Sequence, residues 1–420
     1  MALSAASSFT LNQNDKIFNV HQKRQAEAQL IDVNKNGSLE DKEIMDYLEN
    51  NGDLCGHAGP GHNDARILEE FKTHLQGKMP ESVNAYKTYE ELSAQMDSLA
   101  EKYPGKAKKV SLGKTHEGRD IWALKVSSDV NSESTKEKPA VVVTGVHHAR
   151  EWATSEVPLT IATDTLEAYD TDPAAKKRVD QGELWFVPLV NPDGYTFSRT
   201  ENSWWRKNRR PLEKTPCGEK ITGDIRGVDL NRNYADGKPE HAHIYRSKGD
   251  SPCSTWDDGR ATSDNPRQDT YRGPYGASEI EVQSMLNLEL GRGNVKGVLD
   301  YHSYGGMILY PWGNERGQVD NVDEYRRVGT KMNEAIGDKS YRLMQSVSLY
   351  PTTGGSHDVH HANGIFSITM EIGESFHPRE SELPDIVGRA KRAGTVFIDE
   401  VLAKHTAPPE QGGEQPPAQG

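Results

Sequence analysis

The chain has 420 residues, of which 34% are hydrophobic and 27% charged, and its formal net charge is -13. This length permits a sizeable buried core in one large domain or two ordinary ones. No apolar run approaches the roughly 18 residues of a membrane-spanning helix, and an acidic chain without a basic block disfavours nucleic acid as a partner. We therefore expect no membrane and no nucleic-acid partner; cations and neutral peptides suit this charge better.

The N-terminus and the cysteines give limited information about the compartment. Residues 1–9 lack the basic start and the apolar centre of a secretory signal. Three cysteines, at positions 55, 217 and 253, are too few for a disulfide scaffold and form no CxxC pair. If Cys217 pairs with Cys253, Cys55 is left over, and the protein belongs in an oxidising compartment.

The first segment, residues 1–55, contains a loop with the spacing of an EF-hand. Calcium prefers oxygen ligands arranged around a tight turn that a glycine at the sixth position permits. Helix formers flank the loop over residues 17–31 and 40–49 and predict a helix-loop-helix. A polar capped turn is the alternative, and no second loop of this kind is found. The expected Ca²⁺ ligands are Asp32, Asn34, Asn36, Ser38 and Glu43, with Gly37 at the turn.

The remaining chain divides by composition. Residues 56–84 begin with a Gly-rich turn region and are expected to be a linker. Residues 85–405 alternate apolar strands with amphipathic stretches, which is typical of an α/β sheet covered by helices on both faces. The tail, residues 406–420, is rich in Pro, Gly and Gln and is expected to be disordered.

Within the α/β segment, residues 89–103 have helical periodicity. Strand-like runs occupy residues 140–146, 184–190, 298–302 and 365–372. Catalytic groups of such sheets gather where the strands end. The ends of these runs are therefore the places to search for chemistry.

Two of the strand-like runs end in possible metal ligands. His148 and Glu151 follow the first run and can bind one ion with an imidazole nitrogen and a carboxylate, a donor set that suits zinc. About one His-x-x-Glu pair arises by chance in such a chain, so a surface turn with a salt bridge remains an alternative. His302 ends another strand and supplies the third ligand that a catalytic zinc usually takes.

Glu371 lies inside the apolar run 365–372. A carboxylate there is costly unless it is paired, hydrogen-bonded or protonated. A general base next to a metal-activated water has reason to occupy this environment. A glutamate that faces solvent at the strand end is the alternative.

Ordered motifs over residues 85–405 make the chain resemble the zinc carboxypeptidases of the pancreatic A/B type and their bacterial relatives. The resemblance implies a mixed, mostly parallel, eight-stranded twisted sheet with helices on both faces. It also implies a hydrolase that removes one C-terminal residue from peptides and proteins. The motifs include His116-Glu117-Gly118-Arg119-Asp120, His148-Ala149-Arg150-Glu151-Trp152, Asn191-Pro192-Asp193-Gly194-Tyr195, Asp229-Leu230-Asn231-Arg232-Asn233, His302-Ser303-Tyr304, Tyr350-Pro351-Thr352-Thr353-Gly354-Gly355-Ser356 and Thr369-Met370-Glu371-Ile372.

The same resemblance assigns the catalytic roles. Zn²⁺ would bind to His148, Glu151 and His302, and Glu371 would be the general base. Asp229 would hold the second ring nitrogen of His148. Arg206 would polarise the scissile carbonyl and stabilise the oxyanion.

The substrate contacts are also implied by the resemblance. Asn231 and Arg232 match the pair that clamps the terminal carboxylate, where a guanidinium offers a bidentate fork. Tyr350 matches a mobile tyrosine that closes over substrate, and Arg150 and Tyr304 match residues of the next subsites. Cys217 and Cys253 match a disulfide around the loop that carries the clamp.

One position departs from the family pattern. His357 stands at the pocket floor, where relatives carry an aliphatic residue, aspartate or arginine. Its expected neighbours are neutral: Gly313, Gln345, Thr352 and Thr369. We expect a broad preference for apolar or aromatic C-terminal residues, with acidic ones gaining when His357 is protonated. The nearby His360 and His361 are expected to be structural.

Two other functions remain as alternatives. One is a cell-wall peptide hydrolase of the same fold, and the other is a calcium-regulated, non-catalytic peptide-binding protein. The clamp residues argue against the first and the intact Glu371 against the second. We expect a monomer that is secreted or extracytoplasmic. Residues 1–55 are a candidate pro-region in place of the longer α/β activation domain that is usual in the family.

Overall fold

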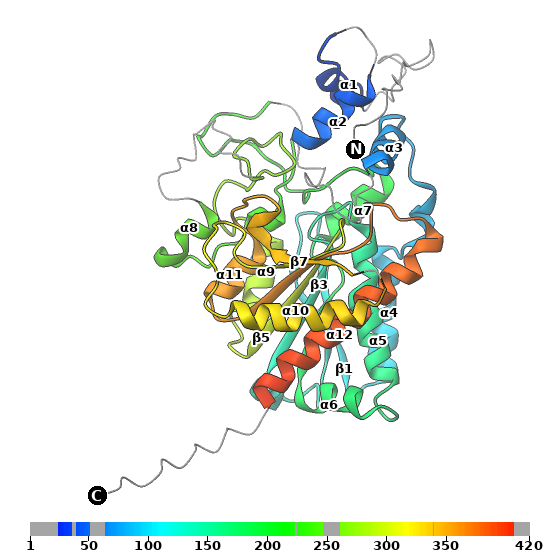
Figure 1. Cartoon of the computed structure of the whole chain (residues 1–420), viewed down its shortest axis with the longest axis vertical. Coiled ribbons are helices and arrows are strands. Elements are labelled where there is room, and N and C mark those ends of the chain that lie inside the picture. Colours follow the sequence, from blue (N-terminus) through cyan, green and yellow to red (C-terminus); the bar gives the residue numbers. More distant parts are fainter. Residues whose placement is uncertain are drawn as a thin grey trace, which may run out of the picture.

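The computed structural model describes residues 24–35, 39–50, 64–222, 225–246, 261–338 and 340–406. Its centre is an eight-stranded sheet in the order β1-β2-β4-β3-β5-β8-β6-β7 (Figure 1). The predicted Ca²⁺ ligands Asn36 and Ser38, and also Cys253, lie outside the described residues. The strands are β1 Ala107–Lys114, β2 Asp120–Val126, β3 Ala140–Gly145, β4 Glu183–Val187, β5 Val295–His302, β6 Met307–Tyr310, β7 Arg342–Gln345 and β8 Phe366–Glu371.

The sheet is mixed and mostly parallel, as the family resemblance implied. Strands β4, β3, β5 and β8 run parallel to one another in the centre, and β6 runs parallel to β7. The ladders β1·β2, β2·β4 and β6·β8 are antiparallel. The parallel centre brings the carboxyl ends of β3, β5 and β8 to one edge.

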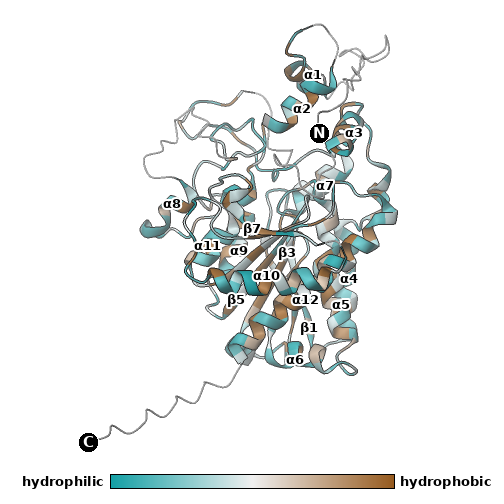
Figure 2. Ribbon diagram, in the orientation of Figure 1, coloured by the Kyte–Doolittle hydropathy of each residue, from teal (hydrophilic) through white to brown (hydrophobic). Residues whose placement is uncertain are grey.

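Alternating side chains of the strands bury into two apolar layers. Val141 and Val143 of β3 face a layer that includes α4, α5, α10 and α12, whereas Ala140 and Val142 face α9 and α11. In Figure 2 the central strands are hydrophobic, whereas the side of α10 that faces the viewer is largely hydrophilic. Helices therefore cover both faces, as predicted. Their bounds are α4 Tyr89–Lys102, α5 Glu156–Glu167, α6 Pro173–Gln181, α7 Pro192–Thr200, α8 Ala242–Tyr245, α9 Ile280–Glu289, α10 Val322–Ile336, α11 Ser356–Ala362 and α12 Leu383–Thr406.

Local sequence explains where several elements begin and end. Helix α4 begins with a capping box in which the side chains of Thr88 and Glu91 bond to each other's backbone N–H groups. Strand β4 ends before Pro188, which has no N–H for the ladder. Strand β3 ends before Val146, whose φ of 53° turns the chain sharply towards His147 and His148.

The N-terminal part is helical and includes more structure than expected. Helices α1 Gln25–Ile31 and α2 Asp41–Asn50 flank the predicted calcium loop, and α3 Asp64–Leu75 lies within the stretch predicted as a linker. The charged composition of that stretch hid an apolar stripe: Ile67, Phe71 and Leu75 recur every four residues and are buried. Among the described residues, no helix is long and apolar enough to cross a membrane.

Candidate active site

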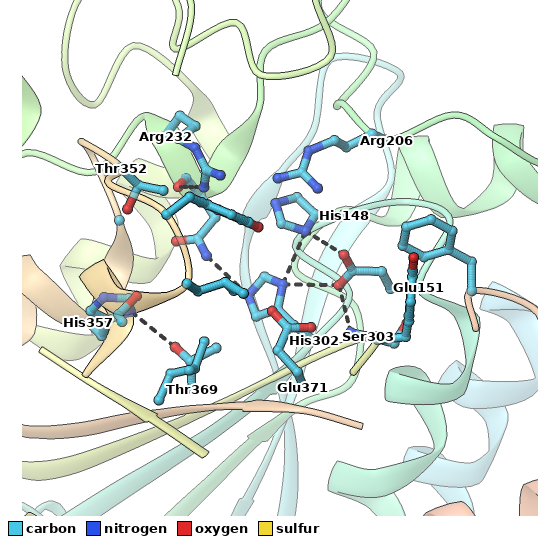
Figure 3. A pocket seen from close by; sticks show the side chains of 18 residues that line it. His148, Glu151, Arg206, Arg232, His302, Ser303, Thr352, His357, Thr369 and Glu371 are labelled. Carbon is cyan, nitrogen blue, oxygen red and sulfur yellow. Dashed lines mark hydrogen bonds and ion pairs between the residues drawn. The ribbon is translucent and has the colours of Figure 1, made fainter. Parts of the chain in front are cut away.

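The predicted catalytic residues meet where the central strands end (Figure 3). The register of the parallel pair β5·β8 places His302 beside Glu371. In the neighbouring pair β3·β5, Gly145 lies beside Tyr301, so the turn after β3 brings His148 to the same edge. Three segments that are distant in sequence thus supply one site.

The three predicted zinc ligands form a compact group of donor atoms. His148 Nδ1 lies 2.7 Å from Glu151 Oε1, and His302 Nδ1 lies 3.0 Å from Glu151 Oε2. The two Nδ1 atoms are 3.1 Å apart. Ligand atoms about 2.1 Å from a tetrahedral zinc are about 3.4 Å from one another, so the His, Glu, His set fits this ion.

Asp229 lies behind His148 and organises three predicted residues at once. Its Oδ1 accepts from His148 Nε2 at 3.1 Å and from the backbone N–H of Asn231 at 3.0 Å. Its Oδ2 accepts from Arg206 Nε at 2.9 Å. The carboxylate therefore fixes the His148 ring with Nδ1 towards the metal position and also holds Arg206 beside it.

Asp300 has the same relation to His302, and the sequence analysis missed it. His302 Nε2 donates to Asp300 Oδ2 at 2.9 Å, and Ser356 Oγ lies 3.2 Å from the same oxygen. The other oxygen, Oδ1, accepts from Thr144 Oγ1 at 2.7 Å and pairs with His147 Nδ1 at 2.9 Å. The signal was present, because residues two apart on a strand share a face.

The charges of the site are balanced for a cation. Burial alone would raise the pKa of Glu151, but His148 and His302 outweigh it and lower that pKa. Burial also opposes ionisation of Asp300, yet His147 and His302 hold its pKa well below the usual range. Burial would lower the pKa of His302, but Asp300 and Glu151 raise it well above its usual value. Burial and Arg206, in contrast, lower the pKa of His148. Glu151 and Asp300 thus carry negative charge beside the point where the ligand atoms converge.

Glu371 differs from these carboxylates. Burial raises its pKa to about 8; His302 opposes this shift and Glu151 adds to it. An acid with this pKa can both accept and release a proton near neutral pH.

All the predicted substrate residues except Arg150 line one pocket with the predicted zinc ligands. Arg232 Nη1 donates to the carbonyl of Asn231 at 2.8 Å, and Asn231 Oδ1 accepts from Ser356 N at 2.9 Å. The pocket is lined by the three ligands and by Arg206, Asn231, Arg232, Ser303, Tyr304, Leu309, Ser346, Leu349, Tyr350, Thr352, Gly355, His357, Thr369, Glu371 and Phe376.

His357 lies in this pocket, as predicted. Its Nδ1 is 3.1 Å from Thr369 Oγ1, and its Nε2 is 3.2 Å from Asp358 Oδ1. Gly313 keeps the space open, because a Cβ there would come within 3.0 Å of His357 Nε2. Gln345 does not line the pocket; its Nε2 donates to the carbonyl of Gly317 at 2.6 Å.

His360 behaves as a structural residue. It is buried, with Nε2 2.8 Å from Glu289 Oε2 and Nδ1 3.1 Å from Ser367 Oγ. These contacts agree with the expectation for this histidine.

Arg150 is not among the residues that line the pocket. Its side chain is fully buried, and its Nη1 donates to the carbonyl of Trp204 at 3.1 Å and to Asp269 Oδ2 at 3.2 Å. Tyr304 does line the pocket, although only 2% of it is exposed. The two residues expected in the outer subsites therefore have different environments.

In the described part of the predicted calcium loop, two backbone N–H groups point towards Glu43. The Glu43 carboxylate accepts from the backbone N–H of Asn34 at 3.3 Å and of Glu40 at 3.2 Å. Asp32 is buried at the end of α1. The predicted ligands that the structure describes thus come from both flanks of one helix-loop-helix.

A second cluster of buried carboxylates lies away from the pocket. Asn208 Nδ2 donates to Glu279 Oε2 at 2.7 Å and to Glu281 Oε2 at 3.1 Å, and Arg210 pairs with Glu279 at 2.7 Å. His116 Nε2 is 3.7 Å from Glu279. Because an amide group already donates to both carboxylates, the cluster has the contacts of a structural network.

The chain belongs to the zinc carboxypeptidase family, whose sequence pattern matches residues 92–392. It is 32% identical over 299 residues to carboxypeptidase A2 of Rattus norvegicus, covering 69% of this chain and 63% of the relative. The chain therefore spans less than two thirds of the length of the curated relatives it matches.

Solved structures share the fold. The structure of thrombin-activatable fibrinolysis inhibitor matches with a TM-score of 0.65 and 24% identity, covering 77% of this chain and 76% of that one. Carboxypeptidase A from Helicoverpa armigera matches with a TM-score of 0.64 and 24% identity, covering 86% of this chain and 81% of that one.

Proposed function

We propose that the protein is a zinc metallocarboxypeptidase that hydrolyses the C-terminal peptide bond of peptides and proteins and releases one amino acid. One observation carries the proposal. A single pocket is lined by a His, Glu, His set, by the half-buried Glu371, and by the Asn231 and Arg232 pair. Ligands, base and carboxylate clamp are the components that this reaction needs.

His148, Glu151 and His302 would hold the zinc ion. When bound, zinc supplies Lewis-acid chemistry: it polarises the scissile carbonyl and makes water more acidic. Asp229 and Asp300 orient the two imidazoles for this role from behind.

The other residues act on substrate and protons. Arg232 and Asn231 would hold the terminal carboxylate, and Tyr350 would close over it. The Glu371 carboxylate would take the proton of the attacking water and pass it to the leaving amine. Arg206 would stabilise the negative charge that develops on the carbonyl oxygen.

Replacing the proposed base tests the reaction directly. Glu371→Gln removes the proton acceptor but none of the three ligands, so turnover of a blocked dipeptide should fall about 10²- to 10⁴-fold while zinc content stays near that of the parent chain. Metal analysis and amino-acid release would be measured on the same samples. Retained turnover in Glu371→Gln would overturn the assignment.

We propose that His357 gives a pocket for apolar or aromatic C-terminal side chains, with basic ones disfavoured. The hydroxyl-bearing residues Ser346, Thr352 and Thr369 line the same pocket as this imidazole, whereas the Asp358 carboxylate, 3.2 Å from His357 Nε2, is not among the residues that line it. Acidic residues should be released better at low pH, where a protonated imidazole can pair with them. A peptide library that varies the last residue tests this; release dominated by Lys or Arg would refute it.

We also propose that the loop of Asp32, Asn34, Asn36, Ser38 and Glu43 binds Ca²⁺. The flanking helices and the inward-facing Glu43 support this. A ligand that binds only the folded protein raises its melting temperature. An unchanged melting temperature with calcium or chelator would exclude this role.

We propose that the protein is a monomer that is secreted or extracytoplasmic, and that Cys217 and Cys253 form the disulfide that the family resemblance implies. Peptide mapping without reduction would detect the disulfide, and a fragment that links Cys217 to Cys55 would contradict it. Cell-wall hydrolysis is the second candidate function, but the carboxylate clamp favours substrates with a free C-terminus.

A further inference from the structure

An apolar cluster joins the N-terminal helices to the wall of the pocket. Three of its members, Trp204, Tyr304 and Phe376, belong to the catalytic part, and the last two line the pocket. The remaining members come from α1, α2, α3 and the calcium loop: Ala28, Ile31, Leu39, Ile44, Leu48, Ile67, Phe71 and Leu75. The N-terminal helices and the pocket wall therefore share one core.

A series of aromatic rings in contact links α3 to the pocket. The Phe71 ring meets the Trp204 ring edge-on, with centroids 4.9 Å apart. Trp204 meets Phe376 at 5.3 Å, and Phe376 meets Tyr304 at 4.9 Å, again edge-on. Such edge-to-face pairs are a favoured arrangement of aromatic side chains, so each ring restricts the position of the next.

Arg150 lies inside this aromatic stack. Its guanidinium is 4.4 Å from the Phe376 ring and 5.4 Å from the Trp204 ring. A buried cation needs such faces and the carboxylate of Asp269 to offset its lost hydration. Arg150 is therefore part of the support of the wall, which explains why it is sealed from the pocket.

Helix α3 also holds the segment that follows Glu371. Arg66 of α3 donates twice to the Glu382 carboxylate, at 3.0 and 2.8 Å. Glu70 of α3 lies 3.5 Å from His377 Nδ1. Together with Phe376, these contacts fix residues 376–382 at three points. Figure 1 shows α3 beside the catalytic part, close to α7.

We propose that α3 is a permanent part of the catalytic unit and that Phe71, acting through Trp204, is a positioning residue for the pocket wall of Tyr304 and Phe376. The proposal rests on the proposed carboxypeptidase activity. It departs from the view that the N-terminal region is a removable pro-region. The outer subsite then consists of two aromatic rings rather than of the Arg150 cation.

Substitution of Phe71 tests the positioning role. Phe71→Leu keeps an apolar side chain but removes the ring, so KM for a blocked dipeptide with an apolar penultimate residue should rise about 2- to 10-fold. We expect kcat and zinc content to stay at the values of the parent chain. Ile67→Ala is the matched control, because Ile67 is equally buried on α3 but has no ring to offer Trp204.

The control separates positioning from general destabilisation. Ile67→Ala should lower the melting temperature and leave KM unchanged. An unchanged KM in Phe71→Leu, or an equal rise in both variants, would overturn the positioning role.

Cleavage of the chain after α3 tests whether α3 is a permanent part of the catalytic unit. Gln76, Gly77 and Lys78 form an exposed turn where a protease recognition sequence can be inserted. After cleavage of the zinc-loaded full chain, the N-terminal fragment should co-elute with the remainder in size exclusion, and activity should persist. Release of the fragment together with a gain in activity would identify a pro-region and overturn the proposal.

The two proposals fail in different ways. If neither the intact nor the cut chain releases an amino acid from any blocked dipeptide, the proposed function fails. Co-elution of the fragment still decides whether α3 is permanent, because it is measured without turnover.

Discussion

The two sides of the pocket are held by different forces. On the metal side, His148 and His302 are each fixed by a buried aspartate of the catalytic part. In the aromatic wall of the pocket, Tyr304 and Phe376 pack against rings and apolar side chains, several of which come from the N-terminal helices. One side depends on directed polar pairs, and the other on apolar packing.

This difference has consequences for mutation. A hydrogen bond to a metal ligand fixes one ring orientation, and its loss changes metal affinity more than folding. Apolar packing is not directional, so loss of a large ring leaves a cavity and lowers the stability of everything that shares the core. The two sides should therefore respond to different measurements.

The largest expected effect is a loss of stability caused by a substitution in the aromatic wall. Trp204→Ala removes the ring that Phe71, Phe376 and Arg150 contact, and truncation of a buried aromatic costs about 3–5 kcal/mol of unfolding free energy. Denaturant unfolding of the zinc-loaded chain would measure this loss. Zinc affinity of the folded variant should match that of the parent, because no predicted ligand touches this ring.

If Trp204→Ala lowers zinc affinity as well as the free energy of unfolding, the proposed difference between the two sides is wrong. Trp204→Phe is the graded control. It keeps a ring in the stack and should recover much of the lost stability, since the deleted volume is smaller.

Glu281 is a buried carboxylate without a strong cationic partner, and it contrasts with Asp229 on the metal side. Burial and the neighbouring Glu279 raise the pKa of Glu281 to about 7, whereas Arg206 and His148 outweigh burial and hold the pKa of Asp229 well below its usual range. Between its unfolded value of 4.5 and about 7, folded Glu281 keeps a proton that the unfolded chain has lost. Stability therefore falls as pH rises through this window.

Glu281→Gln should remove this penalty. The amide resembles the protonated acid, so the variant should gain stability relative to the parent at pH 8, on the order of 2 kcal/mol, and little at pH 4. Melting curves across this range would measure the difference. A gain that is the same at both pH values would show that Glu281 does not titrate in this window.

Local patterns predicted that His148, Glu151 and His302 lie together at one edge of the sheet, as they do in the structure. The apolar runs before His148 and His302 mark parallel strands, and such strands bring their carboxyl ends together. Glu371 lies at the end of β8 and is half-buried, so its place inside an apolar run indicated only part of its environment. These features depend on strand periodicity and on residue chemistry, which sequence records directly. Asp300 was within reach of the same reasoning, because it lies two residues before His302 on the same face.

The wall could not be predicted in this way. Phe71, Trp204 and Phe376 lie far apart in the chain, and no local period links them. The charged residues of α3 led to the prediction of a linker, since few apolar residues form its buried stripe. Burial of Arg150 likewise depends on what packs over it, so its motif alone indicated only a substrate contact. Long-range packing of this kind is a property of the folded chain.

The smallest expected effect is a change in zinc affinity on the metal side. Asp300→Asn keeps the shape of the side chain but weakens the hydrogen bond that fixes His302 with Nδ1 towards Glu151. Loss of such a partner typically lowers metal affinity about 10- to 100-fold. The rate of zinc transfer to a chelator would measure this without substrate.

Ser356→Ala distinguishes orientation of His302 from disturbance of the Asp300 network. It removes the hydroxyl 3.2 Å from Asp300 Oδ2 but leaves the bond from His302 intact. Zinc transfer in Ser356→Ala should therefore stay close to that of the parent. If both variants lose zinc equally, the hydrogen-bond network as a whole holds the His302 ring. Several groups would then act together on the metal side, as they do in the aromatic wall.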